Sequence, residues 1–246
     1  MKQFFVALQF LTILPIKISK INEKDFGKAL VYFPLVGALI GLMLNLSLFS
    51  FSFLPAQVMA ALILVISIII TGGIHLDGFA DTCDGLYGNK PKEEILKIMR
   101  DSHIGTMGVI GLVCLLLLKF TILINIPMES LWKSLIMMTT FSRWTQSLAC
   151  TISNYAREDG KAKYFIEYAQ RKGVIMGGFL TLAIFLLLIN SRGLVVFTIS
   201  LAPIFLFISY VKVKIGGMTG DTVGATNELA EVFVLLNILI LTQVLH

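Results

Sequence analysis

Long apolar runs separated by short polar joints dominate the chain. The stretch from Ala29 to Ile74 contains 46 residues without a single Asp, Glu, Lys, Arg or His. Because one crossing of a bilayer needs about 20 apolar residues, this stretch predicts two membrane-spanning helices with a break near Pro55. Including these two, the predicted spans are 30–53, 56–73, 105–127, 131–151, 174–190, 193–211 and 229–245. The pattern predicts an all-α, polytopic bundle of about seven spans that forms a single integral-membrane domain over residues 1–246.

Two segments fit this pattern less well. The span at 131–151 is the least apolar, since it carries Arg143, which either faces the bundle interior or snorkels to the interface. Residues 4–14 are apolar but too short to span, and Pro15 ends them, so we expect a short interfacial or re-entrant helix. A secretory signal peptide is the alternative for residues 1–16, although no small-x-small cleavage site follows.

Composition and charge agree with a membrane protein. The chain is 57% hydrophobic and only 14% charged, with a mean hydropathy of +0.87, whereas soluble domains are about a quarter charged. Sixteen of the 20 Lys and Arg residues fall on one side of the seven-span arrangement, in 2–28, 90–100, 157–172 and 212–214. Positively charged loops lie on the cytoplasmic side of a membrane. We therefore predict a protein of the cell (inner or cytoplasmic) membrane whose N-terminus lies on the cytoplasmic side. The same rule explains the net charge of +5 without a nucleic-acid partner.

An acidic cluster follows the second predicted span. In the segment TGGIHLDGFADTCDG, Asp77, Asp81 and Asp84 are spaced at i, i+4 and i+7, which places them on one face of a helix. A single acidic residue at a span end is often only solvated, but three crowded carboxylates at a membrane face favour a bound cation. Oxygen ligands without cysteine partners suit Mg²⁺ or Mn²⁺ better than zinc.

A second acidic segment opens the last predicted span. In GGMTGDTVGATNELAE (216–231), Asp221 and Glu228 share a helical face, with Glu231 about 80° round from it. Both acidic segments read G-G-x-x-x-D, so two glycine-rich turns each feed an acidic helix at the same membrane face. The predicted active site therefore faces the cytoplasm.

A basic segment lies between them. MRDSHIGTMG (99–108) contributes Arg100 and His103 just before the third span. Arginine beside metal-binding carboxylates suits a substrate that carries phosphate, whereas Lys97 fits membrane-face anchoring. Together these groups indicate phosphoryl or nucleotidyl transfer. The sequence contains no P-loop and no dinucleotide fingerprint, which disfavours an ATPase or a dehydrogenase.

Several of these segments resemble one known family. GGIHLDGFADTCDGLYG (72–88), EEILKIMRDSHIGTMGV (93–109) and GGMTGDTVGATNELAE (216–231) are similar to the signature segments of the cobalamin synthase (adenosylcobinamide-GDP ribazoletransferase) family. FFVALQFLTILPI (4–16), YFPLVGALIG (32–41) and the region from Arg143 to Arg157 match as well, so the likeness runs from end to end.

The resemblance implies a membrane enzyme of late coenzyme B12 synthesis. Adenosylcobinamide-GDP and α-ribazole, or its 5′-phosphate, would give adenosylcobalamin, or its 5′-phosphate, and GMP, with Mg²⁺ as cofactor. Chemical reasoning on the matching segments then gives each residue an expected role. The expected metal ligands are Asp77, Asp81, Asp84 and Asp221; the expected base is Glu228, with His75 as substitute; and Arg100 and His103 are expected to steady phosphate charge.

Two other interpretations remain open from the sequence. CDP-alcohol phosphotransferases use D-x-x-D-G, which Asp81 to Gly85 matches, but the rest of that motif is absent. A cation-coupled transporter would instead hold its carboxylates near mid-membrane on broken helices. Release of GMP, of CMP or of no nucleotide distinguishes the three.

Overall fold

The computed structural model describes residues 2–18, 20–160 and 162–244, and the described part is a helical bundle. Lys161, which the sequence places in a basic loop, lies outside the described residues. The elements in chain order are α1 (Lys2–Leu11), α2 (Glu23–Ala29), the 3₁₀ turn η1 (Leu30–Tyr32), α3 (Phe33–Ser50), α4 (Ala56–Thr71), α5 (Ile74–Leu86), α6 (Lys92–Ile98), α7 (Thr106–Asn125), α8 (Met128–Thr151), α9 (Lys163–Glu167), α10 (Arg171–Ile189), α11 (Arg192–Ile215) and α12 (Gly220–Val244). No strand occurs among the described residues, which confirms the all-α prediction.

The number of membrane crossings is less than seven when helices are judged by length and composition alone. Five described helical stretches are long and apolar enough to cross a membrane, and the bent pair of α4 and α5, counted as one span, brings the number to six. The helix that falls short is α8, the segment the sequence marked as least apolar. Burial explains its composition: most of its side chains, including Arg143 and Gln146, are buried in the protein and do not meet lipid.

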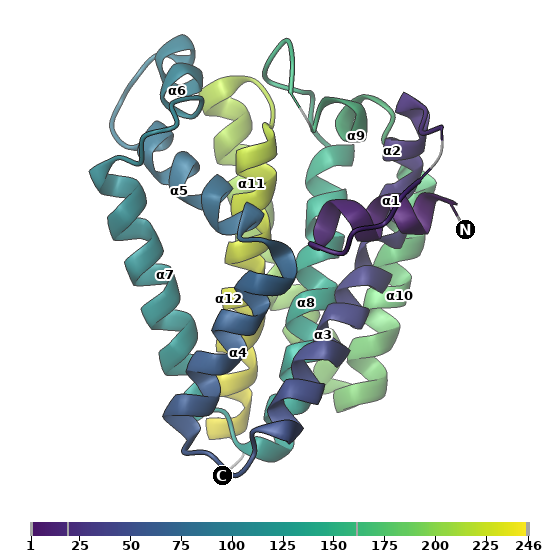
Figure 1. The fold of residues 1–246 in the computed structure, drawn as a ribbon, viewed down its shortest axis with the longest axis vertical. Coiled ribbons are helices and arrows are strands. Elements are labelled where there is room, and N and C mark those ends of the chain that lie inside the picture. Colours follow the sequence, from purple (N-terminus) through teal and green to yellow (C-terminus); the bar gives the residue numbers. More distant parts are fainter. Residues whose placement is uncertain (1, 19, 161, 245–246) are drawn as a thin grey trace.

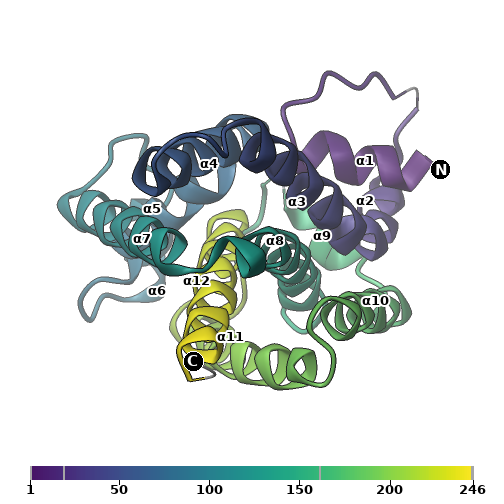
Figure 2. The same cartoon turned by 90° about the horizontal axis from the view of Figure 1, so that it is seen from below.

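Helix α8 lies in the interior, with α3, α10 and α12 packed around it (Figure 2). Small residues let the helices approach closely. A Cβ atom built on Gly37 of α3 would lie 2.3 Å from the carbonyl oxygen of Thr139, and one on Gly41 would lie 2.6 Å from the Thr139 hydroxyl. These two glycines therefore fix the contact between α3 and α8.

The two ends of the bundle differ in character. Helices α2, α6 and α9 gather at one end, with the basic loops, while the α3–α4 turn and the C-terminal end of α12 lie at the other (Figure 1). Helix α1 crosses this bundle sideways and packs on α2 and α3, as expected of a short non-spanning helix. We call the end with α2, α6 and α9 the basic face.

Helix α12 is longer than the membrane span predicted within it. The span was predicted from residue 229 and the acidic segment before it was predicted to be helical; α12 starts at Gly220 and includes the whole segment from Asp221 to Glu231. Thr222, Asn227 and Glu228 are buried by neighbouring helices. Polar residues are tolerated at this depth because protein, not lipid, covers them.

Candidate active site

Glycine turns lead into both acidic helices, one at Gly72 and Gly73 and the other at Gly216. Gly72 and Gly73 have left-handed φ angles of 64° and 69°, and α5 turns by 93° from α4 at this point. Gly216, with a φ of 79°, ends α11 ahead of the turn into α12. Left-handed angles favour glycine because it has no Cβ. The prediction that glycine-rich turns feed both acidic helices is confirmed.

Helices α5 and α12 then cross at very short range. A Cβ atom on Gly78 would lie 2.8 Å from the Cα of Asp221, and one on Gly224 would lie 3.3 Å from the Cα of His75. Only a residue without a side chain fits at Gly78. The crossing brings Asp77, Asp81 and Asp221 to the same corner of the molecule, where Asp77 and Asp221 are among the charges that act on Asp81.

A loop between α8 and α9 adds an arginine to this corner. The backbone of Ala156 donates to the carbonyl of Met218 at 2.9 Å, and Met218 donates to the carbonyl of Asn154 at 2.9 Å. This clip holds Arg157 over the start of α12, where its Nη2 atom lies 2.6 Å from Oδ2 of Asp221. Beside it, partial burial raises the pKa of the Tyr155 phenol, so that this group stays protonated and serves as a donor.

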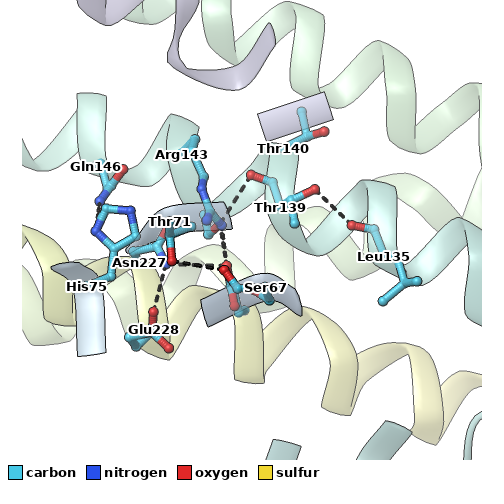
Figure 3. Close-up of polar contacts among 12 residues, drawn as sticks. Ser67, Thr71, His75, Leu135, Thr139, Thr140, Arg143, Gln146, Asn227 and Glu228 are labelled. Carbon is cyan, nitrogen blue, oxygen red and sulfur yellow. Dashed lines mark hydrogen bonds and ion pairs between the residues drawn. The ribbon is translucent and has the colours of Figure 1, made fainter. Parts of the chain in front are cut away.

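A cavity of about 280 Å³ opens at this corner. Its polar wall includes Asp77, Asp221 and Arg157, and its other side is formed by aromatic rings of α1, α3 and α9. His75 and Gln146 also line it, with Nδ1 of His75 3.2 Å from the amide nitrogen of Gln146 (Figure 3). The residues that line the cavity are Phe10, Phe33, Ile74, His75, Asp77, Gln146, Cys150, Tyr155, Arg157, Gly160, Ala162, Phe165, Gly220, Asp221, Val223 and Gly224.

A basic groove adjoins this cavity. It has a volume of about 570 Å³ and runs between α6 and the loop that carries Arg157. Lys92, Lys97 and Arg100 line it, with Glu93 and Glu158 as the acidic members. Arg157 belongs to both walls, so it stands at the junction of the cavity and the groove.

Comparison with known proteins assigns the family. The chain matches the family model described as cobalamin-5-phosphate synthase over residues 3–240. It is 38% identical to the adenosylcobinamide-GDP ribazoletransferase of Clostridium acetobutylicum, covering 96% of this chain and 95% of the relative. Proteins of the same name from Acetivibrio thermocellus and Geotalea daltonii are 36% and 35% identical, with 96% and 97% of both chains covered. The chain belongs to the cobalamin-5-phosphate synthase family. No solved structure matches it.

The residues to which chemical reasoning gave roles lie in several different places in the structure. Asp77, Asp221 and His75 line the cavity, and Asp81 lies within electrostatic range of Asp77 and Asp221. Within the described residues, however, no three Asp, Glu, His or Cys side chains are close enough to hold one metal ion. The carboxylates of Asp77 and Asp81 accept no hydrogen bond from the described part of the protein.

Asp84 has a different set of contacts. Its two oxygens accept hydrogen bonds from the backbone N–H groups of Gly105 at 2.7 Å and Gly108 at 2.8 Å. These amides lie at the start of α7, where a helix leaves backbone donors unpaired. A Cβ atom on either glycine would lie 2.4 Å from the Asp84 carboxylate. Asp84 thus fastens α5 to the N-terminus of α7.

Glu228 lies deeper than the cavity, in a buried ionic network. Its Oε2 accepts from Nζ of Lys119 at 2.6 Å, and the same Nζ lies 2.6 Å from Oε2 of Glu231. Glu231 also pairs with Arg143, which is buried, so Arg143 faces the interior and does not snorkel. Two positive and two negative groups balance one another in this quartet of Lys119, Arg143, Glu228 and Glu231.

The two residues expected to steady phosphate differ in position. Arg100 is on the wall of the basic groove, and its Nη2 lies 3.4 Å from the carbonyl of Asp159. His103 is outside both the cavity and the groove, with Nδ1 2.7 Å from Asp101 and a side chain that is 91% exposed. Hydrogen bonds from the His103 backbone and ring lower the pKa of Asp101.

Arg157 is the functional candidate that sequence reasoning missed. Arg157 lies far from both acidic segments in the sequence, so helical spacing could not connect it to them. The positive-inside rule already accounted for its charge. Only the resemblance around Tyr155 to Arg157 marked the region, without a role. The backbone clip to Met218, which joins segments more than 60 residues apart, is what gives this arginine its place.

Proposed function

We propose that this chain transfers the adenosylcobinamide-phosphate moiety of adenosylcobinamide-GDP to α-ribazole, or to α-ribazole 5′-phosphate, with release of GMP. The product is adenosylcobalamin or its 5′-phosphate, at the final stage of coenzyme B12 synthesis. The observation that carries this proposal is the match to curated relatives named adenosylcobinamide-GDP ribazoletransferase over 95% or more of both chains. The Asp221–Arg157 pair, at the junction of a cavity and a basic groove, supports the proposal because these charged groups suit a phosphate-bearing substrate.

The bond changes define what the site must do. A ribose hydroxyl oxygen of the acceptor attacks the phosphorus that carries the corrinoid's aminopropanol arm, and a new P–O bond forms. The P–O bond to GMP breaks, and its electron pair leaves with the GMP phosphate. The hydroxyl proton goes to a base. Charge accumulates on the phosphate oxygens during the transfer, so preorganised cations contribute most to the rate.

We assign the phosphate contacts to the basic groove and its junction. Arg157 has a guanidinium at the edge shared with the cavity, and Arg100 lines the groove beside Lys92 and Lys97. Arginine holds phosphate oxygens through a planar fork of donors. In this assignment the diphosphate of the donor lies at the junction, and its guanosine extends along the groove. His103 lines neither the cavity nor the groove, so we assign it no phosphate contact.

We assign Mg²⁺ to the carboxylates around Asp221. Asp77, Asp81 and Asp221 offer hard oxygen donors from two crossing helices, and Asp77 and Asp81 have no hydrogen-bond donor of their own among the described residues. Mg²⁺ keeps several waters and needs only one or two protein carboxylates when the substrate supplies phosphates. Bound there, it would neutralise charge on the diphosphate and on the departing GMP. Asp84, which both α7 amides engage, is the weakest of the four expected ligands.

The base is better assigned to His75 than to Glu228. His75 lines the cavity, whereas Glu228 is held by Lys119 in the buried quartet. A 180° flip of the Gln146 amide lets its oxygen accept from Nδ1–H of His75, which leaves Nε2 free to receive a proton. Gln146 would then orient the imidazole during the transfer.

The test is nucleotide release by detergent-purified protein. Adenosylcobinamide-GDP and α-ribazole are supplied with and without Mg²⁺, and wild type is compared with Asp81→Asn and with Glu129→Gln, an exposed carboxylate at the opposite end of the bundle. Metal-dependent GMP and adenosylcobalamin in wild type and Glu129→Gln, lost in folded Asp81→Asn, support the function and the acidic site. CMP release from a CDP-linked alcohol, or no nucleotide release by folded wild type, would contradict the proposal.

A further inference from the structure

The cavity beside Asp221 has an aromatic wall built from three distant segments. Phe10 of α1, Phe33 of α3 and Phe165 of α9 line it. The ring centroids of Phe10 and Phe165 are 4.4 Å apart, and those of Phe33 and Phe165 are 5.6 Å apart. Phe33 and Phe165 are fully buried and hold Phe10 from behind, so the partly exposed ring of Phe10 is the aromatic surface that the wall presents to the cavity.

The facing wall is polar and incompletely paired. Nε2 of His75, Nε of Arg157 and whichever atom of the Gln146 amide is turned away from Nδ1 of His75 are buried without a hydrogen-bond partner among the described residues. All three residues line the cavity. A buried polar atom that stays unpaired costs about 1–3 kcal/mol, so such groups normally meet a partner. Three of them on one cavity wall indicate a ligand with several hydroxyl or ring-nitrogen groups.

We infer that this cavity is the subsite of the nucleoside acceptor, with its flat base against Phe10 and its ribose toward His75, Gln146 and Arg157. The inference rests on the proposed function, because that reaction requires a benzimidazole nucleoside as acceptor. A lipid chain would cover the rings but leave the polar wall unpaired. A base with an attached ribose satisfies both walls.

Size separates the two substrates. The cavity of about 280 Å³ is at the small end of ligand pockets, which span about 300–1,000 Å³. It has room for a nucleoside but not for a corrinoid, so the corrinoid ring stays outside and only its phosphate arm reaches the Asp221–Arg157 junction. Helix α1 then serves as one wall of the acceptor site, and the preference for the acceptor's base resides in Phe10, which Phe33 and Phe165 hold in place.

The decisive comparison is Phe10→Leu against Phe26→Leu. Both substitutions remove one ring from the same aromatic cluster, since Phe10 and Phe26 each contact Phe165, but only Phe10 lines the cavity. Calorimetric titration of α-ribazole into each purified protein gives its Kd without any turnover. Steady-state assays give the KM for α-ribazole and for adenosylcobinamide-GDP, and GMP titration reports on the nucleotide side.

Stacking of a base on an aromatic ring contributes about 1–3 kcal/mol, and a tenfold change in Kd corresponds to about 1.4 kcal/mol. We expect Phe10→Leu to raise the Kd and KM for α-ribazole about tenfold, with the KM for adenosylcobinamide-GDP and the GMP affinity unchanged. Phe26→Leu should leave all four values within about twofold.

An equal loss in Phe26→Leu, or a turning-over Phe10→Leu enzyme with an unchanged KM for α-ribazole, would overturn the inference. A selective loss of GMP affinity in Phe10→Leu would also overturn it, since the guanine would then occupy the cavity. Failure of the proposed function would give a different result. If α-ribazole binding depends on Phe10 but the protein releases no GMP, the subsite is supported and the proposed reaction is contradicted.

Discussion

Nη2 of Arg157 lies 2.6 Å from Oδ2 of Asp221, and this ion pair joins residues 64 positions apart at the meeting point of the cavity and the basic groove. Neither residue is fully buried, so both remain available to a ligand. Because Arg157 is held by a single carboxylate, its guanidinium can exchange Asp221 for the diphosphate of the incoming substrate. The pair thus keeps the arginine in place before the substrate binds.

Arg157→Ala is therefore expected to lower kcat/KM for GMP formation about 10²–10³-fold, the effect of removing one transition-state donor. Arg157→Lys should recover only part of this loss, because a lysine lacks the planar fork. Lys163→Ala is the matched control: it removes a cation of the same region whose exposed partner Asp159 is 3.7 Å away. The measurement is kcat/KM for GMP formation by the three variants, provided that each melts at the wild-type temperature. An equal loss of kcat/KM in Lys163→Ala would refute the prediction.

Asp84→Ala is expected to lower the free energy of unfolding by about 1–2 kcal/mol, because it removes the acceptor for two N-terminal amides of α7. Asp77→Ala, which removes an exposed carboxylate without such contacts, should leave stability almost unchanged. Thermal unfolding in detergent and a Mg²⁺ titration of activity, done on both variants, separate the two roles. An Asp84→Ala protein of normal stability with weakened Mg²⁺ dependence would show instead that Asp84 is a metal ligand.

The buried quartet predicts strong coupling between Lys119 and Glu228. Lys119→Met leaves two carboxylates against one arginine in the bundle interior, and breaking a buried pair in this way costs about 3–5 kcal/mol. The double variant Lys119→Met/Glu228→Gln restores equal charge, so it should be more stable than Lys119→Met alone. Unfolding of both single variants and the double variant completes the cycle.

The same cycle tests the role of Glu228. If Glu228 only balances Lys119, the double variant should recover activity together with stability. A stable double variant that releases no GMP would restore Glu228 as the base.

Topology can be tested by labelling single cysteines. With the three native cysteines replaced, a cysteine at position 90 or 161 should react with a membrane-impermeant reagent only after the cells are opened. One at position 133, at the opposite end of the bundle, should react in intact cells. Labelling of positions 90 and 161 from outside would contradict the proposed cytoplasmic active site.

The sequence by itself determined the helical bundle, the short non-spanning helix α1 and the glycine turns that lead into two acidic helices. Apolar run length and glycine placement are local properties, and the membrane enforces them because every backbone group in lipid must be paired within its own helix. The sequence also marked α8 as unusual. Local pattern was a poor guide to how deeply the acidic start of α12 is buried, since the sequence does not distinguish a polar residue covered by protein from one exposed to solvent.

Only the tertiary structure decided which polar residues meet. Asp84 and Asp81 look equivalent along the helix, yet the start of α7 engages the first and leaves the second free. Glu228 shares a helical face with Asp221, but Lys119 from α7 draws it into the interior. Arg157 and the rings of Phe10 and Phe165 reach the site through loop and helix packing between distant segments. Such contacts depend on which helices cross, and helical spacing within one segment carries no information about the partner helix.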